Sequence, residues 1–158
     1  MGLAYKLKRF IEATVCAMVY YSGLIFLVRW VVRKKVVIIR YHRVNDENDA
    51  FFPASRIKVF RNHVRYLARW CSIVSMEKAY NYITQGAPLP PNPVVITFDD
   101  GYRDNYRHAY LELKAVDGTA TIYLTTGCIG TDAVTWTEEV HYLLKQTSQE
   151  QLPPQPWV

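Results

Sequence analysis

Two runs of mostly β-branched residues constrain the fold of this chain more than any other feature. They are Val36–Tyr41 (VVIIRY) and Val94–Phe98 (VVITF), and neither alternates regularly between apolar and polar side chains. Such runs are typical of strands that are buried on both faces, as in a parallel sheet. Because parallel strands need helices to connect and cover them, the sequence predicts the α/β class.

Further helices and strands are indicated between and after these runs. Ser55 is a plausible N-cap for a helix that runs to about Trp70, with apolar side chains at helical spacing. The later predicted elements are a strand at Cys71–Val74, a helix from Ser75 to near Gly86, a helix from Asp104 or Asn105 to Asp117-Gly118, a strand at Thr119–Thr126 and a helix at Thr137–Gln146. About four neighbouring, mainly parallel strands with helices outside are too few to close a barrel. We therefore expect either a small open α/β sheet or part of a larger barrel.

The positive charge of the chain is concentrated in its first 35 residues. Residues 1–35 carry seven basic side chains and one acidic side chain, whereas the remainder has a net charge of −1. A nucleic-acid-binding domain should carry a basic stripe on its folded part. The distribution therefore argues against a nucleic-acid partner.

Between its basic flanks, this first segment is apolar. Phe10–Val28 contains one charge, Glu12, and as a continuous helix would be close to the thickness of a bilayer core. Tyr20-Tyr21-Ser22 at mid-segment weakens a spanning interpretation. Residues 1–35 are thus predicted to be a basic-flanked hydrophobic helix, serving as a membrane anchor or as an interfacial or domain-packed helix, with a cleaved signal peptide less well supported. We expect membrane association, with the cell envelope favoured.

Composition excludes several other classes. Half of the residues are hydrophobic and 21% are charged, which excludes disorder as the main state. The three cysteines form no C-x-x-C, so a disulfide-dense scaffold and a cysteine-rich zinc module are both excluded.

The densest group of reactive side chains is Thr97–Asn105 (TFDDGYRDN), directly after a buried strand. Ligands of α/β folds bind at the carboxyl ends of strands. Asp99 and Asp100 repel one another there, and a divalent metal would compensate them, with one Asp as a ligand and the other free as a base. Gly101 would supply the turn. An isolated Asp-Asp-Gly is more often just a turn, but the complete nonapeptide favours a site.

Several segments resemble the polysaccharide deacetylase (NodB-homology) family of carbohydrate esterases. The resemblance spans roughly residues 36–146. Besides Thr97–Gly101, it includes Tyr41-His42-Arg43-Val44, Phe60-x-x-His63, Ile73-Val74-Ser75, Pro88-Leu89-Pro90, Tyr102-x-Asp104-Asn105-Tyr106 and Thr126-Gly127-x-Ile129-Gly130. It implies a distorted (β/α)7 barrel, of which about four strands would be present here.

The same resemblance implies a chemistry. Members remove N-acetyl or O-acetyl groups from polysaccharides, so the implied substrate is an acetylated glycan. Asp99 would be the general base, and Asp100 would be a ligand of a divalent metal, commonly zinc. His42 would be the acid that protonates the leaving group; from the residues alone, a histidine at a strand end could be an acid, a ligand or a core residue.

The departures from the family pattern predict an incomplete site. The second family motif, His-[Ser/Thr]-x-x-His, completes the metal ligands, but none of the histidines has that spacing. His63, His108 and His141 are interpreted as structural or surface residues, and Arg40 replaces a usual apolar residue. We expect residues 36–150 to be the N-terminal part of a deacetylase domain, truncated before the second motif and followed by a proline-rich tail at 151–158. The alternatives are an inactive deacetylase-like remnant and a membrane-anchored interaction protein.

Overall fold

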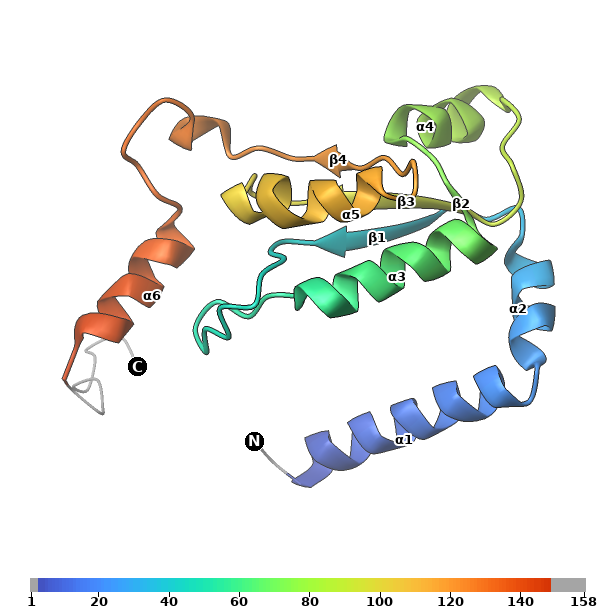
Figure 1. Ribbon diagram of the computed structural model, residues 1–158, viewed down its shortest axis with the longest axis horizontal. Helices are drawn as coiled ribbons and strands as arrows, with labels where there is room; N and C mark the ends of the chain where they lie inside the picture. The colour runs from blue at the N-terminus through green and yellow to red at the C-terminus, as the bar shows by residue number, and fades with distance from the viewer. Residues whose placement is uncertain (1–2, 149–158) are drawn as a thin grey trace.

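The computed structural model of the chain describes residues 3–148, so the tail at 151–158 lies outside the described residues. Its centre is a parallel sheet of four strands, in which the long strand β3 pairs with all three others (Figure 1). β1 runs along one edge of β3, whereas the short strands β2 and β4 pair with its beginning and its end. The strands are β1 (Val37–Tyr41), β2 (Ser72–Ile73), β3 (Pro93–Phe98) and β4 (Thr121–Ile122). The predicted α/β class and the parallel pairing are confirmed.

The pairing of β1 with β3 positions the chemistry. Its register runs from Val37 opposite Val94 to Tyr41 opposite Phe98. The ladder continues one step further, since the Asp99 amide donates to the Tyr41 carbonyl at 3.0 Å. His42 and Asp99 therefore leave the sheet at the same level.

Helices cover both faces of the sheet. α3 (Ile57–Trp70) and α5 (Tyr110–Lys114) pack on the face that carries Val94, Ile96 and Phe98, where a core forms with Phe60, Val64, Leu67, Ala109 and Leu113. α4 (Met76–Gln85) packs instead on the face of Val95, through Ala79.

The helices lie outside the sheet, as expected, and they occupy both of its faces. The chain passes from β1 to β2 across β3 and then returns to β3, which reverses the direction of the crossover. A right-handed connection in the return direction must use the opposite face of the sheet.

The start of α3 differs from its prediction. Arg56 occupies the N-cap position, and the side chain of Asp46 accepts a hydrogen bond from the Ile57 amide at 3.0 Å. Ser55 instead bonds through its backbone to Arg43 and Asn45. A loop residue eleven positions upstream thus replaces the predicted cap. For α4, the predicted ends are confirmed. The Ser75 hydroxyl caps the helix by accepting a hydrogen bond from the Lys78 amide, and Gly86 ends it in the left-handed conformation.

After β3 the chain forms a π-helix, η1 (Asn105–Ala109), that continues into α5. The strand predicted at Thr119–Thr126 is reduced to β4, because β3 ends at Phe98, whose carbonyl accepts the last hydrogen bond from the Tyr123 amide. A 3-10 turn, η2 (Thr126–Cys128), leads to α6 (Trp136–Gln146), which Thr135 caps.

The predicted continuous N-terminal helix is in fact two helices. α1 (Leu3–Tyr21) and α2 (Leu24–Val32) meet at Gly23, which has a φ of 79°, and their axes are bent by 92°. Within residues 3–148, neither helix alone is long and apolar enough to cross a bilayer, although the bent pair together meets the requirements of length and composition. The break falls at the polar Ser22-Gly23 pair, where glycine permits the left-handed backbone.

An ion pair joins α3 and α5, which pack on the same face of the sheet. The Arg61 guanidinium of α3 donates to both carboxylate oxygens of Glu112 in α5, at 2.9 and 2.8 Å. These hydrogen bonds hold the pKa of Glu112 below its usual value. The carboxylate form is therefore favoured in the folded state.

We expect Glu112→Gln to lower the free energy of unfolding by about 1 kcal/mol at neutral pH. Because the folded-state pKa of Glu112 is lowered, its contribution is complete above the ordinary glutamate pKa and disappears as pH falls through the lowered value. Thermal unfolding at pH 7 and pH 3 checks this, with Asp132→Asn in an exposed loop as the control. A difference from the parent that does not shrink between pH 7 and pH 3 contradicts the assignment to the ion pair.

Candidate active site

Three charged or titratable side chains meet at the carboxyl end of β1 and β3. Arg40 and His42 share one face of β1, since strand residues two apart point the same way. Asp99 follows β3 at the same height as His42 and contacts both side chains. Its Oδ2 atom lies 3.6 Å from His42 Nε2 and 3.6 Å from Arg40 Nε. His42 and Asp99 therefore emerge together at this edge of the sheet. The contact with Arg40, which sequence reasoning noted only as a departure, was missed.

The chain turns sharply directly after Asp99. Asp100 and Gly101 both have left-handed backbone conformations, with φ of 67° and 69°. Such a conformation is uncommon for a residue other than glycine and is often found at functional sites. The turn separates the two carboxylates: Asp99 stays with His42, and Asp100 faces a neighbouring cavity.

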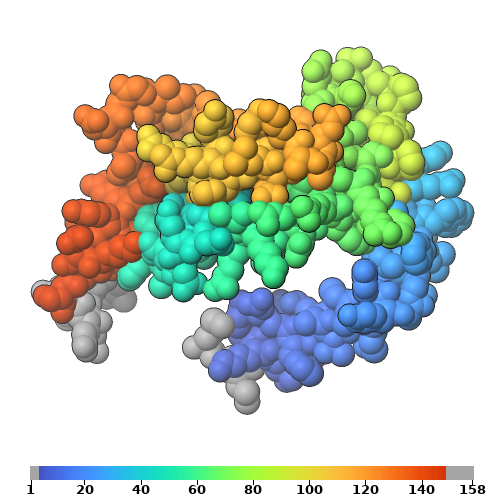
Figure 2. Space-filling view, in the orientation of Figure 1, coloured from blue at the N-terminus to red at the C-terminus, as the bar shows by residue number. Residues whose placement is uncertain are grey.

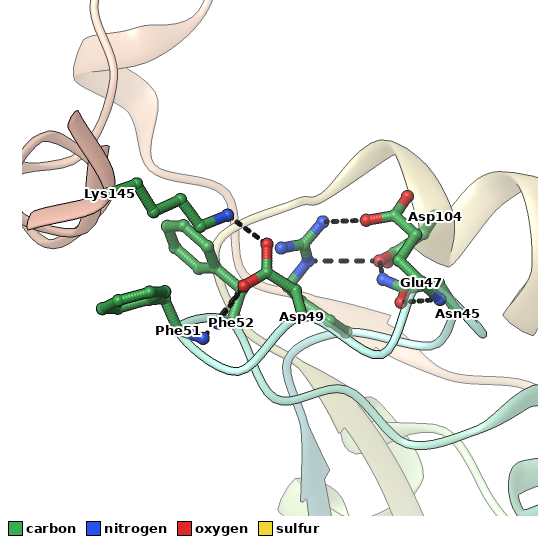
Figure 3. Close-up of polar contacts among 8 residues, drawn as sticks. Asn45, Glu47, Asp49, Phe51, Phe52, Asp104 and Lys145 are labelled. Carbon is green, nitrogen blue, oxygen red and sulfur yellow. Dashed lines mark hydrogen bonds and ion pairs between the residues drawn. The ribbon is translucent and has the colours of Figure 1, made fainter.

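A buried network supports the site from below. Asp104 is nearly buried, and its Oδ2 accepts from Asn45 Nδ2 at 2.6 Å and from Arg43 Nε at 3.3 Å (Figure 3). The side-chain amide of Asn105 is oriented so that its nitrogen faces acceptors. That nitrogen donates to the second oxygen of Asp104 and to the backbone carbonyl of His42, each at 3.0 Å. Asp104 occupies the N-cap position of η1 (Asn105–Ala109), near the predicted helix start, but its side chain makes no capping bond. Its carboxylate links the segment after His42 to the segment after Asp99.

A cavity of about 440 Å³ opens beside this network. Its wall combines the end of β1, the turn at Asp100, the loop around residues 51–55 and the first turns of α6. The acidic loop Asn45–Asp49 precedes the segment at 51–55 that lines this wall.

The loop is held in place by contacts at both ends. Asn45 is buried, and the Asp49 carboxylate accepts a hydrogen bond from the Lys145 ammonium of α6 (Figure 3). This bond, followed by the bond from the Phe51 amide, holds the pKa of Asp49 below its usual value. The Lys145 ammonium also lies over the ring of Phe52, at 5.4 Å from its centroid. α6 is thereby fastened to the loop on the far side of the cavity.

His141 of α6 is another residue of this wall that sequence reasoning missed. It was interpreted as a surface residue, but its ring meets Phe52 edge to face at 4.5 Å and lines the cavity. Its Nδ1 atom is buried and finds no hydrogen-bond partner among residues 3–148. Helical periodicity alone gave no signal for His141, because the surface on which His141 packs comes from a distant loop.

His63 bonds through Nδ1 to the Tyr41 hydroxyl at 3.1 Å, in line with its structural interpretation.

The described side chains do not make a complete metal site. Across residues 3–148, no three histidine, cysteine, aspartate or glutamate side chains are grouped so that they could hold an ion. Catalytic zinc sites generally use three protein ligands. Asp100 is thus a single candidate ligand, and the donor set described here does not fit a divalent metal.

Comparisons with known proteins show which family the chain resembles. Residues 86–150 match the family model described as "Polysaccharide deacetylase". A Bacillus subtilis protein named "Putative polysaccharide deacetylase YxkH" is 34% identical over 97 residues, which are 61% of this chain and 34% of that protein. The chain therefore spans about a third of the length of this curated relative.

Solved structures show the same fold. IcaB from Ammonifex degensii is 28% identical, with a TM-score of 0.55 over 62% of this chain and 41% of that chain. The Streptococcus pyogenes deacetylase PplD, solved in complex with acetate, has a TM-score of 0.53 at 19% identity over 68% and 52% of the two chains. A polysaccharide deacetylase from Bacillus cereus has a TM-score of 0.51 at 20% identity over 72% and 36%.

These matches agree on the polysaccharide deacetylase family, and the resemblance stated from the sequence is confirmed. The four-stranded sheet corresponds to part of the deacetylase barrel.

The turn after Asp99 can be tested with three matched substitutions. We expect Gly101→Ala and Gly86→Ala each to lower the free energy of unfolding by about 1 kcal/mol, because both glycines have positive φ. Leu124 touches the position of a Gly101 side chain, but it is exposed and can rotate away. Gly127→Ala, without positive φ or close neighbours, is the control. Chemical denaturation measures all three, and equal values for Gly101→Ala and Gly127→Ala would show that the turn does not need its left-handed backbone.

Proposed function

We propose that this chain provides the acid–base part of a polysaccharide deacetylase site, which hydrolyses acetyl groups of an acetylated glycan. The observation that carries the proposal is the pairing of His42 Nε2 with Asp99 Oδ2, 3.6 Å apart, at the strand ends where α/β folds place their ligands. Similarity to the deacetylase family supports the reaction class, and the His42–Asp99 pair supports the choice of residues.

In this proposal Asp99 is the general base, and His42 is the general acid. Both are accessible, since about a quarter of the Asp99 side chain and half of the His42 side chain are exposed. A carboxylate beside an imidazole can take a proton from water and stabilise the protonated ring, which can then donate to a leaving amine or alcohol. The positively charged Arg40 guanidinium lies beside the same Asp99 oxygen, so it balances the negative charge of the carboxylate when His42 is neutral.

The adjoining cavity suits a sugar ring. Aromatic side chains from the loop and from the turn, Phe52 and Tyr102, line it together with polar groups of Arg43 and Asp100. Apolar walls with a few polar groups are typical of small-molecule sites. We infer that the acetylated sugar binds here, beside the His42–Asp99 pair.

The role of Asp100 is proposed as that of one metal ligand, for a divalent metal such as zinc. Because residues 3–148 group no three ligands, the remaining ligands would have to come from outside the described residues. We derive no catalytic step through the metal from this arrangement. The same observation favours a second candidate function, a deacetylase-like chain without activity.

We expect the chain alone to release no acetate from an acetylated chitin oligomer in the presence of zinc. A chimera that joins residues 1–146 to the remainder of the Bacillus subtilis relative should release it, provided that the intact relative does. In that chimera Asp99→Asn should lower kcat by about 100-fold or more, and His42→Gln should remove one limb of the pH–rate profile. Asp132→Asn is the matched control.

Two results would separate the candidate functions. An active chimera that is insensitive to Asp99→Asn contradicts the proposed base. A chimera that folds and stays inactive beside an active relative favours the second candidate, a chain without activity.

Zinc binding can be measured separately from activity. With Asp100 as a single ligand, calorimetry of the chain should show zinc binding weaker than about 10 µM. Asp100→Asn should then change the midpoint of thermal unfolding in zinc no more than Asp132→Asn does. Tight zinc binding that Asp100→Asn abolishes would overturn the view that the ligand set is incomplete.

A further inference from the structure

The N-terminal helix α1 exposes apolar side chains without covering any part of the domain. Figure 2 shows it standing apart from the sheet and its helices over most of its length. Phe10 is 69% exposed and Tyr21 is 85% exposed, and about half of each side chain is exposed at Ile11, Val15, Met18 and Tyr20 between them. An isolated helix gains little stability in water, so a surface of this kind indicates a partner.

The second helix, α2, is by contrast fastened to the domain. Arg29 donates to the carbonyl of Trp70, at the end of α3, at 2.6 Å, and its guanidinium lies 4.8 Å from the centre of the Trp70 ring. The Phe26 ring packs edge to face on the same tryptophan. α2 is therefore a fixed stem, and the bend at Gly23 sets the direction in which α1 leaves it.

The bend changes where the basic residues lie. Lys6, Lys8 and Arg9 form one cluster in α1, and Arg33, Lys34 and Lys35 form another directly after α2. In a straight spanning helix, the two clusters would lie on opposite sides of a membrane. Because the axes of α1 and α2 are bent by 92°, both basic clusters can instead lie at the same membrane surface.

The lengths of the arms agree with this arrangement. At about 1.5 Å per residue, α1 is roughly 28 Å long and α2 is roughly 14 Å long. If both outer ends rest at one surface, a right-angled bend places Gly23 roughly 12 Å below it, which is less than half of an about 30 Å hydrocarbon core. The apex would remain within one leaflet.

Several polar groups at the apex have hydrogen-bond partners within the chain. The amides of Ser22 and Gly23 bond to carbonyls of α1, and the Gly23 carbonyl accepts from Phe26. The Ser22 hydroxyl lies within hydrogen-bond distance of the Val19 carbonyl and of the Leu24 amide. Irregular backbone survives in lipid only when its polar groups are satisfied in this way.

We propose that α1 and α2 insert as a bent pair into a single leaflet of a membrane that carries anionic headgroups. The two basic clusters bind headgroups of that same leaflet, and residue 4 and the folded domain lie on the same side. This inference is independent of the proposed deacetylase function.

Charge dependence is tested with the full chain, whose intact N-terminus is verified by mass spectrometry. The chain should float with vesicles of phosphatidylcholine and 30% phosphatidylglycerol, and reversing the charges of Lys6, Lys8 and Arg9 to Glu should lower its partition coefficient by about 100-fold. Reversal of Lys78, Arg107 and Lys114 on the domain is the matched control. Equal losses in both variants, or no binding by the parent chain, would overturn the proposal.

Topology is tested by thiol labelling with a membrane-impermeant maleimide, on sealed vesicles with the protein added outside. Single cysteines are compared at position 4 (Ala4→Cys), at the native Cys16 in the middle of α1, and at position 62 on the exposed surface of α3 (Asn62→Cys), with the other cysteines changed to alanine. We expect positions 4 and 62 to react with vesicles present, and Cys16 to react only without them. Circular dichroism confirms that each variant is folded.

Two other outcomes would reject the arrangement. If position 4 reacts only after detergent is added, the helices span the membrane. If Cys16 is protected without vesicles and light scattering shows a dimer, a second copy of the chain covers α1 instead.

Discussion

The alignment of β1 with β3 is the constraint on which the rest of the structure depends. One extra hydrogen bond beyond the ladder, from the Asp99 amide to the Tyr41 carbonyl, brings His42 level with Asp99. A slip of one residue would reverse the faces of Arg40 and His42 and separate both from Asp99. Because β3 is buried along its whole length, such a slip would also expose core side chains, so core packing and site geometry enforce the same register.

The sequence predicted the parts of this molecule that depend on local pattern. The two long strands, the helix between Ser75 and Gly86, and the position of Asp99 at a strand end all follow from short stretches of residues and their turn chemistry. It failed where a partner comes from far along the chain. Asp46 caps α3, Lys145 reaches Asp49, and His141 packs on Phe52, and none of these contacts has a signature within its own element.

The prediction of one continuous N-terminal helix was wrong for a different reason. Hydropathy over residues 10–28 predicted one continuous segment, and a hydropathy sum does not depend on backbone direction. Tyr20-Tyr21-Ser22 was interpreted only as a polar interruption of a membrane span, and the glycine that follows it was not interpreted as a point where a helix can turn. A left-handed glycine there changes which charges share a side, so a composition that looked ambiguous for a straight helix becomes consistent for a bent one.

The π-helical turn after the site also makes the molecule sensitive to the length of this segment. In η1 the Tyr110 amide bonds to the Asn105 carbonyl, five residues back, so the turn holds one residue more than an α-helical turn. That extra residue lets Asp104 and Asn105 face the network beneath His42 while Ala109 and Leu113 face the core. Deleting a single residue here would rotate one group relative to the other by about 100°. The chain would then have to give up either the anchoring of its site or the packing of α5, even though no reactive side chain had been changed.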